Sequence, residues 1–457
     1  MGRICVYLLL LVYPLLAFAE DAPVVLSLDE AIKLALQQNR TLQSARDRIS
    51  SANISLESAQ SEFAVKIRPE VSGFLQNDQE VSQGYGLRVS KKFHIGGELS
   101  WQVQTQIDKS LTKQYQTEVT VAYTQPLLKG RGTLPTTAEL VTAERGTRSQ
   151  YRSLVLAQQQ LMINVATAYY GILRDQMMVD VNAQTLARAK TLLQAAEAKL
   201  QVGMASKMDV FRAELQALTA ENGVVDAQAA LQNTKRQFNV LLGMAFETEF
   251  TLSSTLDYQP VTVDQEQLIQ QALANRLEIQ EAYENLNDAE RQVQLARQNL
   301  SPPLDVSIRY TFNGAGNGFE ESLDLNENRW GIGVNSAFNL DTARDSATYQ
   351  QAQLAYNSAL RAIQAAEQDV TLDALQTVTN VNQAQARVTL QEQSVRQAEK
   401  QWELADLRYK KGLSDNLDVI DAEGTLLTAR TNYYAAIAQH LIAQLKLKQV
   451  AGTLETP

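Results

Sequence analysis

Two short stretches of the chain place acidic residues just after a glycine that interrupts a long helical pattern. They read LQVGMASKMDVF (200–211) and YKKGLSDNLDVI (409–420), and each has an aspartate–valine pair six residues after its glycine. Asp418 lies in the second stretch, and Asp421 follows one turn later, so a helix would place both carboxylates on one face. Crowded carboxylates repel each other, raise their own pKa values and attract cations. The chemistry that these residues offer is electrostatic.

Catalytic chemistry has no visible residue set. The chain has two histidines, His94 beside a predicted turn and His440 in the last predicted helix, and it lacks H-E-x-x-H, paired-cysteine and P-loop spacings. The run GAGNG (314–318) superficially resembles a nucleotide-binding loop, but it follows a strand pattern and opens no helical pattern. We therefore expect no enzymatic activity, no catalytic residues, no metal site and no cofactor.

The N-terminus reads as an export signal. Arg3 precedes an apolar run that ends in Ala17-Phe18-Ala19, which predicts a signal peptide over residues 1–19. The alternative is a membrane anchor, although the apolar run is short for a span and no basic stop-transfer cluster follows. The only cysteine, Cys5, lies inside this segment, so the mature chain needs no disulfides. The net charge of −10 over 457 residues argues against nucleic acid as a partner.

The chain reads as an internal duplication. ALQQNRTLQSA (35–45) resembles ALANRLEIQEA (272–282), at a spacing of 237 positions. Gly203 and Gly412, like Gly243 and Gly452, lie 209 positions apart. The first half must therefore contain 28 more residues than the second somewhere between these matches.

Strand patterns account for the difference. Residues 304–312 and 330–334 alternate between apolar and polar side chains, which predicts one hairpin with a long loop. The first half shows four such segments between residues 71 and 123, so one extra hairpin supplies the additional length. In both halves the preceding helix is expected to end at proline, Pro69 in the first half and Pro302 in the second.

Long helical patterns fill the rest of the chain, with small and uncharged polar residues on the faces opposite the apolar stripe. Helices are expected at roughly 27–66, 137–200, 207–243, 264–300, 342–410 and 415–451. The predicted organisation is a signal peptide (1–19), a first repeat (20–245, strands about 69–125, tip about 201–208), a connector (246–263) and a second repeat (264–457, strands about 304–339, tip about 410–416).

The strands suggest a membrane. Each clear strand has about 9–11 residues and an apolar face, which suits a transmembrane β-strand. One chain has too few strands to close a barrel alone, and open sheet edges are not tolerated in lipid, so several chains must pool their strands. The alternatives are a soluble β-sandwich or a long coiled coil without special function. The extra hairpin could widen the barrel or lie partly outside the bilayer. Lys91 shares a face with Val89 and Phe93, and on a lipid face it would be tolerated only near the interface, where its side chain could reach water.

The whole mature chain resembles the TolC-type outer membrane efflux protein family. The resemblance rests on the duplicated order of elements, on ALANRLEIQEA, on TQPLLKGRG (124–132) and on the two glycine-centred stretches at 200–211 and 409–420. It implies a mainly α-helical homotrimer in the outer membrane of a Gram-negative cell. A transmembrane antiparallel β-barrel is then joined to a coiled-coil α-helical barrel that crosses much of the periplasm. The implied partners are outer membrane lipid, a periplasmic adaptor protein and an inner-membrane transporter.

The resemblance also implies a role for the stretches at 200–211 and 409–420. They would be the tips of two helical hairpins, and these tips would contact the adaptor. The implied contact residues are Gly203, Met204, Ser206, Gly412, Leu413 and Asp415. The implied pore constriction consists of Asp418, Asp421, Tyr409 and Asp209. Arg212 stands where the second copy has Asp421, and Ser414 stands where some members of the family carry an arginine, so the closing mechanism stays open.

Two functions remain compatible with these patterns. The first is an exit duct of a tripartite efflux pump or of a type I secretion system. The second is a periplasm-spanning structural protein that tethers the outer membrane without transporting. The sequence does not distinguish drugs, metals and proteins as cargo.

Overall fold

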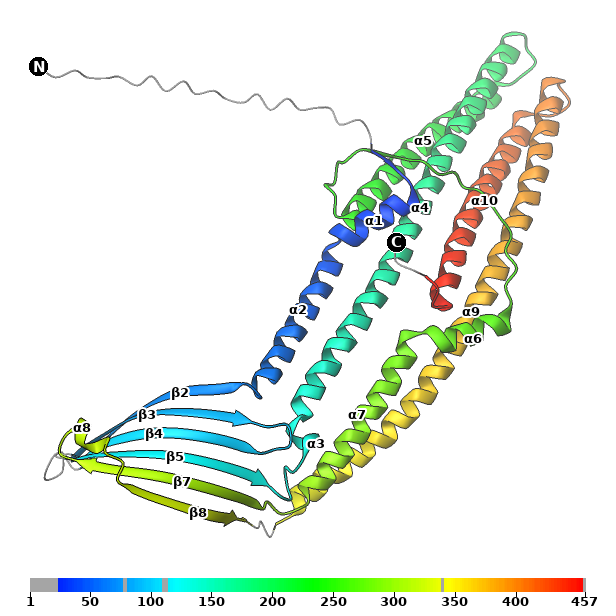
Figure 1. The fold of residues 1–457 in the computed structure, drawn as a ribbon. Helices are drawn as coiled ribbons and strands as arrows, with labels where there is room; N and C mark the ends of the chain where they lie inside the picture. Colours follow the sequence, from blue (N-terminus) through cyan, green and yellow to red (C-terminus); the bar gives the residue numbers. More distant parts are fainter. Residues whose placement is uncertain (1–23, 77–79, 109–113, 338–340, 455–457) are drawn as a thin grey trace, which may run out of the picture.

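The computed structural model describes residues 24–76, 80–108, 114–337 and 341–454, so the predicted signal peptide lies outside it. The chain is elongated, with an antiparallel sheet at one end and two helical hairpins at the other (Figure 1). The helices are α1 (Leu28–Gln38), α2 (Arg40–Ser61), α3 (Thr133–Thr136), α4 (Ala138–Gln201), α5 (Lys207–Leu242), α6 (Gln265–Asn275), α7 (Leu277–Asn299), α8 (Phe319–Ser322), α9 (Ala343–Lys410) and α10 (Asn416–Val450). The strands are β1 (Val24–Leu26), β2 (Val65–Gln76), β3 (Glu80–Lys92), β4 (Glu98–Asp108), β5 (Gln114–Pro126), β6 (Phe250–Leu252), β7 (Asp305–Gly316) and β8 (Glu327–Asn335).

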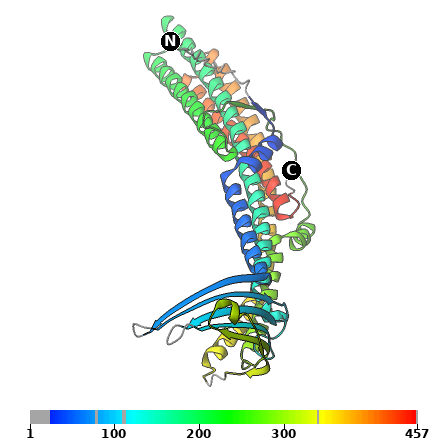
Figure 2. The ribbon, with the colours of Figure 1, turned by 60° about the vertical axis from the view of Figure 1, so that its left-hand side comes forward.

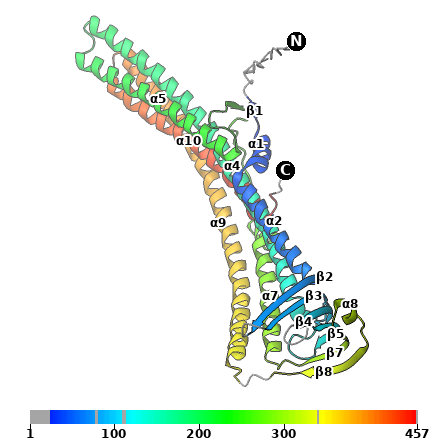
Figure 3. The same cartoon turned by 90° about the vertical axis from the view of Figure 1, so that its left-hand side faces the viewer.

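Two helices run along nearly the whole helical part. α4 has 64 residues and α9 has 68, and at a rise of ~1.5 Å per residue each is about 100 Å long. α2 packs on the half of α4 next to the sheet, and α5 packs on the half near the tip. α7 and α10 pack on α9 in the same way. The views from other sides show these helices as one column that leads away from the sheet (Figure 2, Figure 3).

The column has a joint at the same place in both repeats. α1 and α2 meet at Asn39, which caps α2 through its side-chain oxygen, and α6 and α7 meet at Arg276. The hairpins end against these joints at glycines with positive φ. A Cβ atom on Gly243 would lie 2.8 Å from the carbonyl oxygen of Gln38, and one on Gly452 would lie 2.6 Å from Cβ of Asn275. Glycine is therefore needed at both places for its conformation and for the close approach.

Apolar packing is concentrated at the first joint. The largest buried cluster joins α1, the start of α2, α4 and α5 with the two short strands β1 and β6, which pair in parallel. Tyr169, Phe238 and Leu42 are its largest fully buried side chains. Near the tips the buried residues are mostly alanines, which let α4 and α5 approach closely. In the part of the chain that the structure describes, no helix has both the length and the apolar character required to cross a membrane.

The sheet has six antiparallel strands in the order β2-β3-β4-β5-β7-β8. Its register aligns one row of apolar side chains across all strands, namely Ile67, Val89, Trp101, Val121, Tyr310 and Trp330. The next row lies on the opposite face and is polar, namely Arg68, Arg88, Gln102, Thr120, Thr311 and Arg329. The alternation predicted from the sequence thus extends over the whole sheet.

Two local expectations were wrong. The first helical run ends at Ser61 rather than near Pro69, and β2 already begins at Val65. Pro69 lies inside β2, where it is tolerated because β2 is an edge strand of the sheet. The GAGNG run does lead into a helix, because the four-residue helix α8 follows Gly318. This helix is held on the apolar side of the sheet by a 2.8 Å hydrogen bond between the hydroxyls of Ser322 and Thr117.

Candidate functional site

The two helical hairpins turn at Gly203 and Gly412, at the end of the molecule opposite the sheet (Figure 1). Their φ angles are 74° and 73°, which L-residues rarely adopt. The residue after each glycine donates its N–H to the carbonyl oxygen five positions earlier, at 2.8 Å in the first turn and 2.9 Å in the second. This bond, with one from the glycine N–H itself, ends each helix in a Schellman motif. The two stretches are therefore turns between helices with the same backbone conformation and the same hydrogen bonds.

The returning helices begin at capping residues. The Ser206 hydroxyl accepts from the Asp209 N–H, and the Asp209 carboxylate accepts from both the N–H and the hydroxyl of Ser206, which forms a capping box. These bonds, first from the backbone and then from the hydroxyl, lower the pKa of Asp209, and Arg212 contributes through its charge. Asp415 caps α10 by accepting from the Leu417 N–H. Asp209 is thus committed to its own helix terminus.

The outermost side chains of the turns are apolar and exposed. Met204 in the first turn is 69% exposed, and Leu413 in the second is 71% exposed. The second turn also presents Lys411 to solvent. The two tips thus share their backbone conformation and an exposed apolar side chain, but they differ in charge.

The tips are packed against each other below the turns. Leu192, Ala196, Ala213, Ala405, Tyr409, Val419 and Ala422 form one buried cluster that includes residues of both hairpins. The Asn416 side chain donates to the Asp209 carbonyl oxygen over 2.6 Å, so the start of α10 is bonded to α5. The hairpins therefore form one unit in this state.

Tyr409 is buried at the centre of this unit. The Lys199 ammonium lies 3.6 Å from the centre of the tyrosine ring and donates to the Tyr409 carbonyl oxygen. Burial raises the pKa of the Tyr409 phenol, and the charge of Asp209 adds to the shift. The phenol oxygen has no hydrogen-bond partner among the described residues. Within the described chain Tyr409 contributes a packed ring, and Asp209 acts on it through charge without a hydrogen bond.

An ion pair joins the hairpins one to two turns farther from the tips. Both carboxylate oxygens of Glu423 accept from the Arg188 guanidinium at 2.8–3.0 Å, and the Glu423 side chain is only 5% exposed. The guanidinium also lies 5.3 Å from the centre of the Trp402 ring. A cavity of about 130 Å³ is lined by these three residues and Tyr409. Sequence reasoning missed this link, since Glu423 looks like another acid on a solvated helix.

Asp418 and Asp421 lie on the other side of α10. Both are exposed, whereas Val419 and Ala422 between and beside them are buried against the hairpins. The structure therefore brings the two carboxylates to one face that points away from the hairpin core. It does not bring them to Asp209 or Tyr409, which lie on the packed side.

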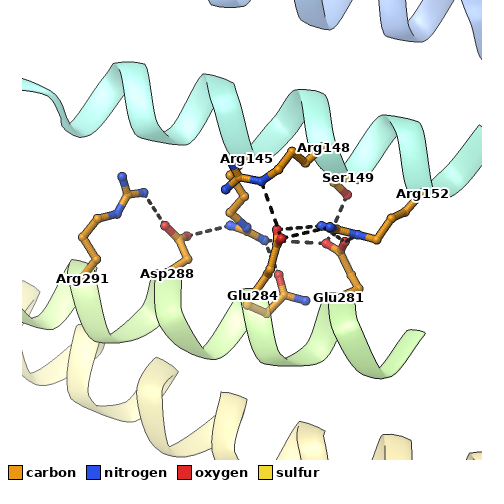
Figure 4. A network of polar contacts seen from close by, with 9 residues as sticks. Arg145, Arg148, Ser149, Arg152, Glu281, Glu284, Asp288 and Arg291 are labelled. Carbon is orange, nitrogen blue, oxygen red and sulfur yellow. Dashed lines mark hydrogen bonds and ion pairs between the residues drawn. The ribbon is translucent and has the colours of Figure 1, made fainter. Parts of the chain in front are cut away.

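A second polar cluster joins the repeats nearer the sheet, between α4 and α7 (Figure 4). The Arg152 guanidinium donates to the carboxylates of Glu281 and Glu284 at 2.7–3.0 Å. The Arg145 guanidinium donates to Asp288 at 2.7 Å, and Arg291 donates to the same carboxylate. The bond from Arg152, supported by its charge, lowers the pKa of Glu284. This ion ladder joins the first repeat to the second through charged side chains.

Solved structures with a similar fold include proteins of the outer membrane. The crystal structure of the outer membrane protein VceC from Vibrio cholerae is similar in fold, with a TM-score of 0.71 and 18% identity, over 93% of this chain and 96% of that one. The sequence model of the outer membrane efflux protein family matches residues 31–244 and 268–453, so the chain belongs to this family. The resemblance to TolC-type proteins is thereby confirmed.

Individual relatives agree. TolC of Vibrio cholerae is 27% identical over 325 residues, which span 69% of this chain and 73% of that protein. TolC of Escherichia coli K12 is 25% identical over 318 residues, which span 65% of this chain and 62% of that protein. The protein is thus an efflux protein of the Gram-negative outer membrane, with its helical part extending into the periplasm.

Proposed function

We propose that the chain forms the exit duct of a tripartite efflux pump, as a homotrimer whose sheets close a transmembrane barrel in the outer membrane. The observation that carries the proposal is the sheet, which has one continuous apolar face, one polar face and two unpaired edges within the described chain. Such edges are costly in lipid unless further copies pair with them. The polar face then lines an aqueous lumen that continues between the helices.

The tips are the proposed docking surface for a periplasmic adaptor, which connects the duct to an inner-membrane transporter. Support comes from their position opposite the sheet and from the exposed Met204 and Leu413. Six tips in a trimer would offer two alternating surfaces, one with Met204 and one with Leu413 and Lys411. The same duct would also serve a type I secretion system, since nothing in its geometry depends on the cargo.

The exposed face of α10 is the proposed constriction. In a trimer, Asp418 and Asp421 would form two rings of three carboxylates each if this face lines the lumen. Their exposure away from the hairpin core supports this placement. Tyr409 and Asp209 hold the neighbouring packing and do not line the pore in this proposal.

Planar bilayer recordings test the channel and its gate together. We expect the purified trimer to conduct and to be blocked by divalent or trivalent cations added from the helical side. Asp418→Ala with Asp421→Ala should remove most of the block while current persists, since alanine suits a helix. The matched control is Glu214→Ala with Asp226→Ala, which removes two exposed carboxylates of α5.

The outcomes separate the candidates. Unchanged block in the double variant would place these acids outside the pore. A trimer that never conducts, with or without the acids, would favour the tethering function. Block that disappears equally in the α5 control would mean that general surface charge, and no ring of carboxylates, attracts the cation.

A further inference from the structure

The outermost hairpin of the sheet, β2–β3, has the same two faces as the strands beside it. Val65, Ile67 and Val71 of β2 are 59%, 65% and 78% exposed on the apolar side. On the polar face Glu70 and Arg88 form an ion pair of 3.0 Å. A hairpin in water would have no reason to expose an apolar row in register with Trp101 and Val121. The pattern therefore favours lipid on one side of all six strands.

The two edges of the sheet are complementary. β2 leaves α2 and runs away from the helices, and β8 returns towards α9, so β2 of one copy and β8 of another would meet antiparallel (Figure 1). The apolar residues of β8, Trp330, Ile332 and Val334, have the spacing of a strand face and are 64–74% exposed. Within the described residues neither edge has a partner strand on its outer side.

The perimeter of the helical part gives an independent estimate of how many strands the barrel contains. At the sheet end each chain contributes α2, α4, α7 and α9, which pack side by side. Twelve helices at interaxial distances of ~8–10 Å make a ring with a perimeter of roughly 100–120 Å. Eighteen strands spaced ~4.8 Å and tilted ~40° make a perimeter of about 110 Å, whereas twelve strands make about 75 Å. At this tilt eighteen strands have the perimeter of the helical ring, and twelve strands would need a much steeper tilt to reach it.

We infer that all six strands of each copy enter the membrane, so that three copies close an 18-stranded barrel in which β2 of one copy pairs with β8 of the next. The inference rests on the trimeric channel proposed above and concerns its width. The helix α8 packs on the apolar side of the sheet, at the end away from the helices, where Ser322 bonds Thr117. The barrel is then as wide as the helical duct, and selection by size takes place at the tips.

Cysteine pairs test which strands are neighbours. The only natural cysteine, Cys5, lies in the predicted signal peptide, so introduced thiols have no background. Ile67→Cys is combined in turn with Trp330→Cys, Ile332→Cys and Val334→Cys, because the register between copies is unknown. We expect at least one pair to give covalent dimers and trimers on a denaturing gel after mild oxidation.

The matched series replaces Ile67→Cys by Trp101→Cys on β4, with the same three partners. If β2–β3 lay outside the barrel, β8 would neighbour β4 of the next copy, and this series would crosslink. Crosslinking through Trp101, or through neither series in a trimer seen by native mass measurement, would overturn the inference and leave the trimeric channel intact. Absence of the trimer itself would contradict the proposed function.

Removing the hairpin tests the width directly. Val65 pairs with Lys91, so the ends of segment 65–92 lie side by side and can be joined. Because barrel diameter grows about linearly with strand number, the deletion should reduce the barrel cross-section to roughly 0.4 of its value. Polymers added from the sheet side should then be excluded at a smaller size. An unchanged size limit in an assembled deletion trimer would contradict the wide barrel, and the cysteine series decides if the deletion does not assemble.

Discussion

The helix α4 is joined to the second repeat in two different ways along its length. Near the sheet, Arg145 and Arg152 face α7 through an ion ladder whose acidic side chains Glu281 and Glu284 are about 30% exposed. Near the tip, the same helix faces α10 through buried alanines and valine and through one ion pair whose carboxylate, Glu423, is 5% exposed. Exposed ion pairs are individually weak, whereas a buried charge depends strongly on its partner.

The two regions differ in how many cationic partners each buried or half-buried carboxylate has. In the ladder each of the three carboxylates has two cationic partners, so the loss of one arginine leaves every acid paired (Figure 4). At the tip Glu423 has one cationic partner among the described residues, and the hairpins are otherwise joined by the buried cluster and by the bond from Asn416.

The largest expected effect follows from removing Arg188. Arg188→Ala leaves the buried Glu423 carboxylate without a partner and should cost about 3 kcal/mol of local stability. Amide hydrogen exchange over residues 416–429 of α10 measures the loss. Arg152→Ala in the ladder is the matched control, and Arg188→Leu with Glu423→Leu should recover most of the stability. Equal losses of stability in the two alanine variants would contradict the distinction between the ion ladder and the Arg188–Glu423 pair.

A smaller effect is expected from acid on the ladder. The pKa of Glu284 is lower in the folded chain than in an unfolded one, so its stabilisation is fully present above the unfolded value of about 4.3. It is lost as the pH falls through the folded value. A double-mutant cycle of Arg152→Ala and Glu284→Gln should give a coupling of at most ~1 kcal/mol at pH 7, and the coupling should shrink steadily as the solution is acidified. A coupling that persists in acid would show that the link does not depend on the carboxylate charge.

The smallest effect concerns Tyr409. Since its phenol oxygen has no partner among the described residues, Tyr409→Phe should change tip stability by less than ~0.5 kcal/mol. Tyr409→Ala, which removes the ring between Lys199 and the apolar cluster, serves as the contrast and should cost several times as much as the loss of the hydroxyl. Thermal unfolding of the trimer compares the two. A large loss in the phenylalanine variant would reveal a hydrogen bond made only in the assembled channel.

Local rules predicted much of the fold. The glycines with positive φ mark the turns, and period-2 alternation marks the strands, because both signals depend on neighbouring residues. The joint at Asn39 was missed, although an Asn-Arg pair stands near it in both repeats. β2 was placed too late since Val65 and Ile67 alone do not distinguish a strand from the end of a helix.

The ion pairs that join the two repeats could not be predicted from local rules. Arg188 and Glu423 are 235 positions apart, and Arg152 and Glu284 are 132 apart. Which charges meet depends on the rotation of long helices about each other, which no local pattern records. The roles of Asp418 and Asp421 likewise depend on what surrounds them in an assembly.

The broken columns beside α4 and α9 have a mechanical consequence. α4 and α9 are continuous struts, whereas their companions are each divided, α2 from α5 and α7 from α10, at the joints beside Gly243 and Gly452. In the described chain no backbone hydrogen-bond ladder continues from α5 into α2 or from α10 into α7. A torque on α5 or α10 at the tip therefore reaches the sheet only through side-chain packing and through α4 and α9.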